Sequence, residues 1–186
     1  MLDDAADALL RGEVVGIPTD TVYGVAVACS VSGATARLFE VKQRPPDVAL
    51  PVLVADEEQA RSIAQVSPVA ADLMRAHWPG GLTIVLPRAA GFTVDLGGDD
   101  DTTVGVRVAD HHVPVALARR VGPLATTSAN RHGEPTPRTA AGVRDALGIA
   151  VVIDGGVCDG APSTVVAVRD GRVEVLRQGA VVVPAR

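Results

Sequence analysis

Polar side chains that can bind an anion gather where the apolar runs of this sequence end. They are hydroxyls, one amide and several cations, with no histidine-centred triad beside them. In open α/β sheets, ligands bind in the crevice at the strand ends, so this pattern favours an anion-binding site. The alternative is that the hydroxyls and the amide only stabilise turns and helix ends. The set comprises Thr19, Thr21, Tyr23, Lys42, Arg44, Thr103, Arg107, Thr126, Ser128, Asn130, Ser163 and Arg177.

Lys42 is the single lysine among 17 basic residues. A compact ammonium differs from a planar guanidinium, so a lone lysine two residues before Arg44 indicates a position where a point charge is needed. Pro45 and Pro46 follow, and a helix must end before them, which places Lys42 at a helix end or in the loop after it. The alternative is that one lysine remained by chance on a solvated helix.

Two clusters that look like metal ligands are predicted to hold no metal. Asp99, Asp100 and Asp101 follow a Gly-Gly pair, which is typical of a solvated loop. His111 and His112 are adjacent, so they cannot share a helix face, and a helix start after them predicts a loop and cap instead. The sequence also lacks the P-loop, dinucleotide-binding and nucleophile-elbow motifs.

Helical and strand patterns alternate along the chain, which predicts an α/β fold with a mixed sheet. The stretch from Glu13 to Gly24 is expected to be one short strand that Pro18 breaks. A hairpin is expected around Asp170-Gly171. Helices are expected near 3–11, 33–42, 56–66, 67–78, 113–122 and 139–148, and further strands at 50–54, 82–87, 104–108, 123–130, 149–156, 163–168 and 172–177.

Length and composition indicate one globular domain over residues 1–186, with 47% hydrophobic and 21% charged residues. A net charge of −5 and few aromatic rings argue against tight non-specific nucleic-acid binding, which needs many cationic and stacking contacts. No apolar stretch approaches membrane-spanning length, and acidic residues stand where a signal peptide is basic. We therefore expect a cytoplasmic protein without a membrane partner.

Several motifs, in this order and spacing, are similar to those of the YrdC family, and they span most of the chain. Taken singly each motif is weak, whereas the ordered set is specific. The resemblance is to the short, single-domain branch and implies a YrdC-like twisted mixed sheet, flanked by helices, with a concave, positively lined cleft. The motifs are GIPTDTVYG (16–24), FEVKQRP (39–45), LPVLV (50–54), WPGGLTIVL (78–86), TVGVRV (103–108), LATTSAN (124–130), GEPTP (133–137), STVV (163–166) and LRQGA (176–180).

The resemblance implies a nucleotidyltransferase that makes threonylcarbamoyl-AMP and pyrophosphate from L-threonine, bicarbonate and ATP with Mg²⁺. A downstream threonylcarbamoyl-transferase complex would then modify tRNA. Such a reaction needs alignment and charge neutralisation, and no protein nucleophile. The alternatives are a YciO-like paralogue that binds nucleotide without this activity, or a double-stranded-RNA-binding module; weak RNA binding beside the enzymatic activity also remains open.

The resemblance also assigns roles to residues. Lys42, Arg44, Ser128 and Asn130 form the catalytic, phosphate-holding set, and Thr103, Thr136 and Arg177 are further ATP-binding positions. Thr19, Arg107, Thr126 and Ser163 hold threonine. Arg107, within a valine-rich strand, suits a bidentate contact with the threonine carboxylate. The alternative for Arg107 is a structural ion pair with one of the 22 acidic residues.

Overall fold

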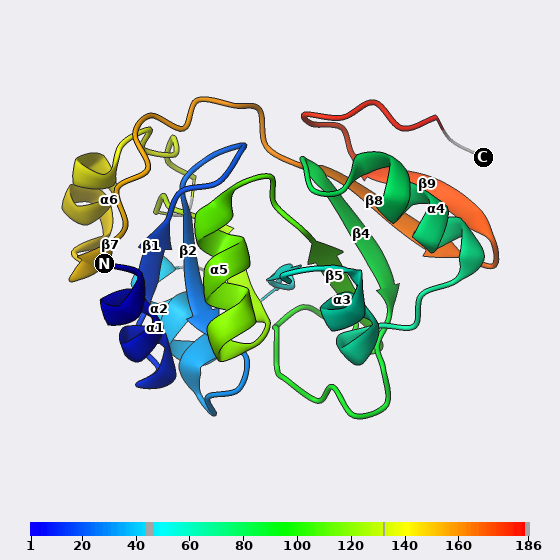
Figure 1. Ribbon diagram of the computed structural model, residues 1–186, viewed down its shortest axis with the longest axis horizontal. Coiled ribbons are helices and arrows are strands. Elements are labelled where there is room, and N and C mark those ends of the chain that lie inside the picture. Colours follow the sequence, from blue (N-terminus) through cyan, green and yellow to red (C-terminus); the bar gives the residue numbers. More distant parts are fainter. Residues whose placement is uncertain (44–46, 132, 185–186) are drawn as a thin grey trace.

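A computed structural model describes residues 1–43, 47–131 and 133–184. Within these ranges, nine strands form one mixed sheet in the order β7-β1-β2-β6-β3-β5-β4-β8-β9, which confirms the predicted α/β class. The sheet runs along the molecule from β7 and β1 at one end to the hairpin of β8 and β9 at the other (Figure 1). The strands are β1 (Val15–Ile17), β2 (Gly24–Ala28), β3 (Val52–Leu53), β4 (Leu82–Pro87), β5 (Thr103–Arg107), β6 (Leu124–Ser128), β7 (Val151–Val152), β8 (Thr164–Arg169) and β9 (Arg172–Arg177).

Helices cover both faces of the sheet. Along β2, Val25 and Val27 pack into one hydrophobic cluster, whereas Ala26 and Ala28 pack into another. Side chains alternate between the two faces of a strand, so a fully buried strand reads as a continuous apolar run. The helices are α1 (Leu2–Leu10), α2 (Ala34–Lys42), α3 (Glu57–Ile63), α4 (Pro68–His77), α5 (His112–Val121) and α6 (Ala140–Leu147).

The prediction of one strand from Glu13 to Gly24 is wrong. β1 ends at Ile17, before Pro18, and Gly24 begins β2 rather than ending a strand. Gly24 pairs with Ser128, and a Cβ at this glycine would lie 3.2 Å from the Thr126 hydroxyl. Gly24 is therefore a point of close approach inside the sheet, and residues 18–23 form the connection between the two strands.

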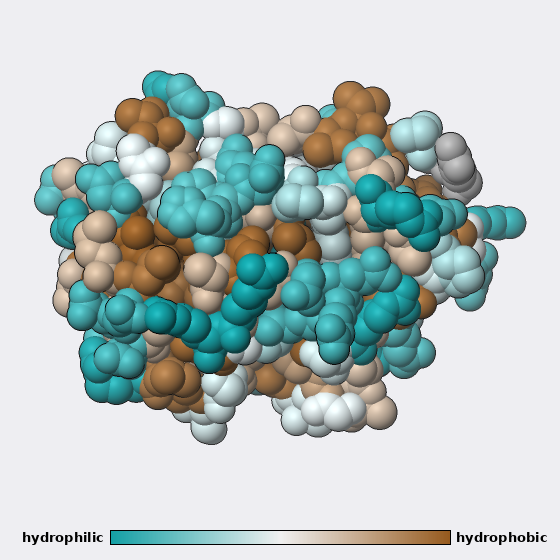
Figure 2. All heavy atoms as spheres, in the orientation of Figure 1, coloured by the Kyte–Doolittle hydropathy of each residue, from teal (hydrophilic) through white to brown (hydrophobic). Residues whose placement is uncertain are grey.

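Hydrophobic and hydrophilic residues are interspersed on the face that Figure 2 shows, and no large apolar surface stands out there. Within the described part of the chain, no helix has the length and apolar character needed to cross a membrane.

The segment after β9 is fixed to the sheet by Thr164, which is fully buried. Its hydroxyl donates to the Val181 carbonyl at 2.5 Å and accepts from the amides of Gly179 and Val181 at 2.9 and 3.0 Å. One hydroxyl thus satisfies several backbone groups of this segment. Because Ser163 and Arg177 flank these contacts, the anchor also positions two of the predicted site residues.

We expect Thr164→Val to lower the free energy of unfolding by about 1–3 kcal/mol, since the valine leaves the partly buried backbone amides of Gly179 and Val181 without their acceptor. Urea unfolding measures this loss, and hydrogen exchange measures the exposure of the Gly179 and Val181 amides. Thr164→Ser keeps the hydroxyl and serves as the matched control. Equal unfolding curves for Thr164→Val and the unchanged chain would contradict the anchoring role.

Candidate anion-binding site

Arg107, the last residue of β5, is 7% exposed and is bound by oxygens of the chain itself. Its Nε donates to the Gly80 carbonyl at 2.9 Å, and its Nη2 donates to Asp20 Oδ1 at 2.6 Å. Nη1 and Nη2 both donate to Thr21 Oγ1, at 3.1 and 3.2 Å. The structure therefore contains the acidic partner that the sequence offered as an alternative for Arg107, and threonine binding by Arg107 stays a prediction.

The hydroxyls of the loop between β1 and β2 have defined directions. Thr19 donates to the Val22 carbonyl at 2.6 Å, so its oxygen is left to accept. The Thr21 hydroxyl, 3.0 Å from the Thr19 hydroxyl, therefore donates to Thr19. This leaves the lone pairs of the Thr21 oxygen facing the Arg107 guanidinium.

A second guanidinium, that of Arg177 at the end of β9, lies near Arg107. Its Nη2 donates to the Ser163 carbonyl at 2.8 Å and to the Ser163 hydroxyl at 3.2 Å. The Ser163 hydroxyl is 3.0 Å from the hydroxyl of Thr83, which precedes the β4 residue that pairs with Val106 of β5. The structure thus brings together Arg107, Ser163 and Arg177.

Electrostatics at this cluster favour an anion. Burial lowers the pKa of the Arg107 guanidinium, Asp20 opposes the shift, and the positive charge of Arg177 lowers the pKa further. Burial also lowers the pKa of Arg177. Arg107 and Arg177 each carry one positive charge, and Asp20 carries one negative charge. The three side chains together therefore have a net positive charge in a partly desolvated place.

The second cluster lies around Lys42, the last residue of α2, which is 3% exposed. Its ammonium donates to the Ser128 carbonyl at 2.6 Å, to Asn130 Oδ1 at 3.1 Å, and to the Asn130 carbonyl. The helix-end prediction for Lys42 is confirmed, and the alternative of a solvated helix position is wrong. The oxygens that accept from the ammonium are of the carbonyl type and carry no formal charge themselves.

Asn130 joins the other members of this cluster. Its Oδ1 accepts from the Ser128 hydroxyl at 2.5 Å and from the Thr136 hydroxyl at 3.4 Å, in addition to Lys42. Its Nδ2 donates to the carbonyls of Arg131 and Glu134, which fixes the direction of the amide. An ammonium, two hydroxyls and an amide therefore converge, and this donor chemistry suits phosphate oxygens. Arg44, the fourth member of the predicted catalytic set, lies outside the described residues.

Residues 18–24 connect the two clusters. Asp20 and Thr21 hold Arg107, while the Tyr23 carbonyl accepts from the Ala129 amide at 2.8 Å, between Ser128 and Asn130. Tyr23 is fully buried, and its hydroxyl donates to the Gly156 carbonyl at 2.9 Å. The TDTVY stretch is therefore fixed at both ends, and it sets the position of one cluster relative to the other.

The remaining predicted threonine-side residues form internal contacts. Thr19 is bound within the loop as described, and Thr126 of β6 donates to the Val25 carbonyl at 3.0 Å. Both are buried. Thr126 is two residues before Ser128 on the same strand, so its place between the clusters follows from β6.

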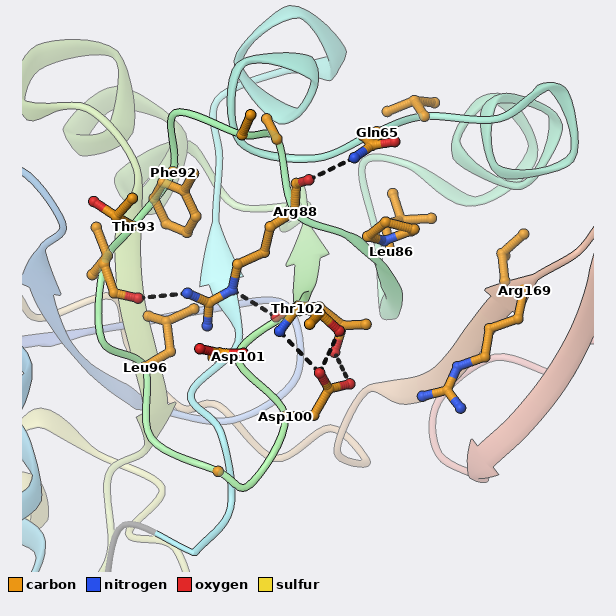
Figure 3. A pocket seen from close by; sticks show the side chains of 18 of the residues that line it. Gln65, Leu86, Arg88, Phe92, Thr93, Leu96, Asp100, Asp101, Thr102 and Arg169 are labelled. Carbon is orange, nitrogen blue, oxygen red and sulfur yellow. Dashed lines mark hydrogen bonds between the residues drawn. The ribbon is translucent and has the colours of Figure 1, made fainter.

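Thr103 lies at the opposite end of β5 from Arg107. It is the first residue of β5, so strand rise separates it from Arg107 by about 13 Å. Its hydroxyl donates to Asp100 at 3.0 Å, and its carbonyl accepts from Arg88. Thr103 lines a cavity of about 1360 Å³ (Figure 3). In this cavity, Arg88 donates hydrogen bonds to the Thr103 and Val94 carbonyls and so links β5 to the segment that precedes it. Lys42, Ser128, Asn130 and Arg107 do not line this cavity.

In both clusters that resemble metal ligands, one side chain forms hydrogen bonds within the chain. His111 caps α5, because its Nδ1 accepts from the Val113 amide at 3.2 Å, which confirms the predicted cap. Asp100 accepts from Thr102 and Thr103 within its loop. Within the ranges that the structure describes, no group of three or more His, Cys, Asp and Glu side chains is arranged to hold a metal ion.

Sequence reasoning did not select two residues that the structure places at the site, Asp20 and Thr83. A buried arginine needs an acidic or anionic partner, and Asp20 lies in the GIPTDTVYG motif at residues 16–24. The need of a buried Arg107 for an acidic partner is therefore the signal in the sequence that points to a residue such as Asp20. The pairing spans 87 positions, so local sequence patterns could not choose among the acidic residues.

Comparisons with known proteins agree with this architecture. Residues 7–179 match the Sua5/YciO/YrdC family, which is described as telomere recombination. Threonylcarbamoyl-AMP synthase of Bacillus subtilis is 39% identical over 185 residues, which cover 95% of this chain and 53% of that protein. Threonylcarbamoyl-AMP synthase of Vibrio vulnificus is 35% identical over 185 residues, which cover 96% of this chain and 98% of that protein.

Solved structures give the same result. P. abyssi Sua5 complexed with L-threonine superposes with a TM-score of 0.88 at 36% identity, covering 96% of this chain and 54% of that chain. E. coli YciO superposes with a TM-score of 0.86 at 25% identity, covering 96% and 88%. The chain thus spans about half the length of the B. subtilis and P. abyssi proteins. By sequence and by structure, this chain belongs to the Sua5/YciO/YrdC family.

Proposed function

We propose that this chain is a threonylcarbamoyl-AMP synthase that uses L-threonine, bicarbonate and ATP. The observation that carries the proposal is the arrangement of two cationic clusters, one around Arg107 and one around Lys42, which the 18–24 segment connects. Such an arrangement suits a substrate carboxylate at one cluster and phosphates at the other. The names of the B. subtilis and V. vulnificus relatives support this reading over that of an inactive paralogue.

At the first cluster, Arg107 attracts the threonine carboxylate, and the neighbouring Arg177 keeps its predicted place on the ATP side. Arg107 is rigid because β5, Gly80 and Asp20 hold its guanidinium, so little side-chain freedom is lost on binding. Three hydroxyls can bind the polar groups of threonine when the hydroxyls rotate away from their internal partners. They belong to Thr19, Thr126 and Ser163. The bound L-threonine of the P. abyssi protein supports an amino-acid site in this fold.

At the second cluster, Lys42, Ser128, Asn130 and Thr136 hold the phosphates of ATP together with Arg44. Mg²⁺ enters with ATP and neutralises phosphate charge, as it does in other phosphoryl- and nucleotidyl-transfer sites, where it keeps few protein ligands. The donors at the Lys42 cluster are an ammonium and hydroxyls, which fit phosphate oxygens and not the metal itself.

The reaction balances without a protein nucleophile. The threonine amine attacks bicarbonate and forms a carbamate with loss of water. A carbamate oxygen then forms a bond to the α-phosphorus of ATP as the bond to pyrophosphate breaks. The chain aligns the reactants, and the cations near the leaving pyrophosphate stabilise the negative charge that develops there.

The product is a mixed anhydride that another protein must consume. We propose that a separate threonylcarbamoyl-transferase complex takes it to tRNA, and that any RNA binding by this chain is weak. A net charge of −5 supports weak binding, because tight backbone recognition requires many cationic contacts.

We expect pyrophosphate release to require threonine, bicarbonate and Mg-ATP together. A coupled pyrophosphate assay in which each component is omitted in turn measures this, with bicarbonate removed by degassing. Release at an equal rate without bicarbonate would instead indicate an adenylating or hydrolytic enzyme. Mass spectrometry of the product separates threonylcarbamoyl-AMP from AMP.

We expect Lys42→Arg to lower turnover by at least about tenfold, or ~1.4 kcal/mol of transition-state stabilisation. A guanidinium is bulkier than the ammonium that the oxygens of Ser128 and Asn130 enclose, and it follows the α-phosphate less well. Steady-state kinetics and an unfolding curve check this. Arg37→Lys exchanges the same two cations at an exposed position of α2 and should leave turnover unchanged. Near-unchanged turnover of Lys42→Arg would mean that only positive charge matters.

A further inference from the structure

We propose that Thr21 is an internal substitute for the substrate carboxylate: its hydroxyl occupies the donor edge of Arg107 that threonine takes when it binds. The inference rests on the proposed function, in which Arg107 binds the threonine carboxylate. It makes Thr21 a residue that sets threonine affinity by competing with the substrate.

The hydrogen bonds of Arg107 leave no free two-donor edge for a carboxylate. An arginine grips a carboxylate with two parallel N–H groups, taken either from Nη1 and Nη2 or from Nε and Nη2. The Gly80 carbonyl and Asp20 occupy the Nε and Nη2 edge. Thr21 Oγ1 alone occupies the Nη1 and Nη2 edge. Bidentate binding of a substrate therefore requires one of these partners to leave.

Thr21 is the partner that leaves at the lower cost. The Asp20 contact is charge-assisted, 2.6 Å long, and reinforced by a hydrogen bond from the Asp110 amide to the same Oδ1. The Thr21 contacts are neutral on the acceptor side, and both nitrogens share one oxygen at 3.1 and 3.2 Å. Hydrogen bonds to ionised acceptors are stronger than those to neutral ones, so the incoming carboxylate displaces Thr21 and not Asp20.

The exchange needs only a side-chain rotation. The Thr21 carbonyl accepts from the Gly160 amide at 2.8 Å, which fixes the backbone of this residue. Threonine has alternative staggered χ1 rotamers, and a change of rotamer moves Oγ1 away while the backbone stays in place. The Thr21 oxygen has its lone pairs toward Arg107 because its proton goes to Thr19. It thus presents to the guanidinium the same accepting face that a carboxylate oxygen presents.

The sign of a mutational effect tests the proposal. Thr21→Val removes an interaction that exists only before threonine binds, so the substrate-free state loses stability and the bound state does not. We expect the Kd of L-threonine, measured by isothermal titration calorimetry, to fall about fivefold. This factor corresponds to the net free energy of one hydrogen bond. Thr21→Ser keeps the hydroxyl and should bind threonine with the Kd of the unchanged chain. ATP affinity should be the same in all variants.

Other outcomes overturn the proposal. A higher threonine Kd in Thr21→Val would mean that the hydroxyl contacts bound substrate, and an unchanged Kd would mean that it does not compete. If either occurs while Arg107→Ala abolishes threonine binding, the proposed function stands and this inference alone fails. If the unchanged chain does not bind threonine, both fail. Should Thr21→Val not fold, Thr21→Ala gives the same readout with the same expected direction.

Discussion

The burial of the Arg107 guanidinium is the constraint on which the candidate site depends. A buried charge costs several kcal/mol unless it is paired and its N–H groups are satisfied. The chain meets this requirement with Asp20, Thr21 and the Gly80 carbonyl, two of which belong to one loop. That loop consequently has a defined conformation, because its own residues satisfy Arg107.

Satisfying Arg107 also sets the spacing between the two clusters. The loop that supplies Asp20 and Thr21 continues into Tyr23, which bonds to Ala129 beside Ser128, and into Gly24, which pairs with Ser128 itself. A carboxylate and a triphosphate bound at the two clusters would share one rigid support. Rigid positioning is the main contribution that a protein makes when substrates supply both nucleophile and leaving group.

Local patterns were sufficient to predict much of the fold and part of the site. The mixed sheet, the hairpin at Asp170-Gly171 and the helix end at Lys42 follow from short-range signals. Local patterns do not reveal β2, because a strand buried on both faces has no alternation and because a glycine such as Gly24 is typical of a strand end. The Asp20 to Arg107 pair and the contact of Arg88 with the Thr103 carbonyl depend on tertiary contacts that no local spacing encodes.

Titration calorimetry with L-threonine and L-threoninamide tests the central claim most directly, since an uncharged amide with a single acceptor oxygen replaces the carboxylate. If Arg107 holds that carboxylate, Arg107→Ala should weaken threonine binding by about 30- to 1000-fold, the loss of one charge-assisted bidentate contact. The same variant should change threoninamide binding far less. Equal losses for both ligands in a folded variant, or equal affinity of the unchanged chain for both, would contradict the account.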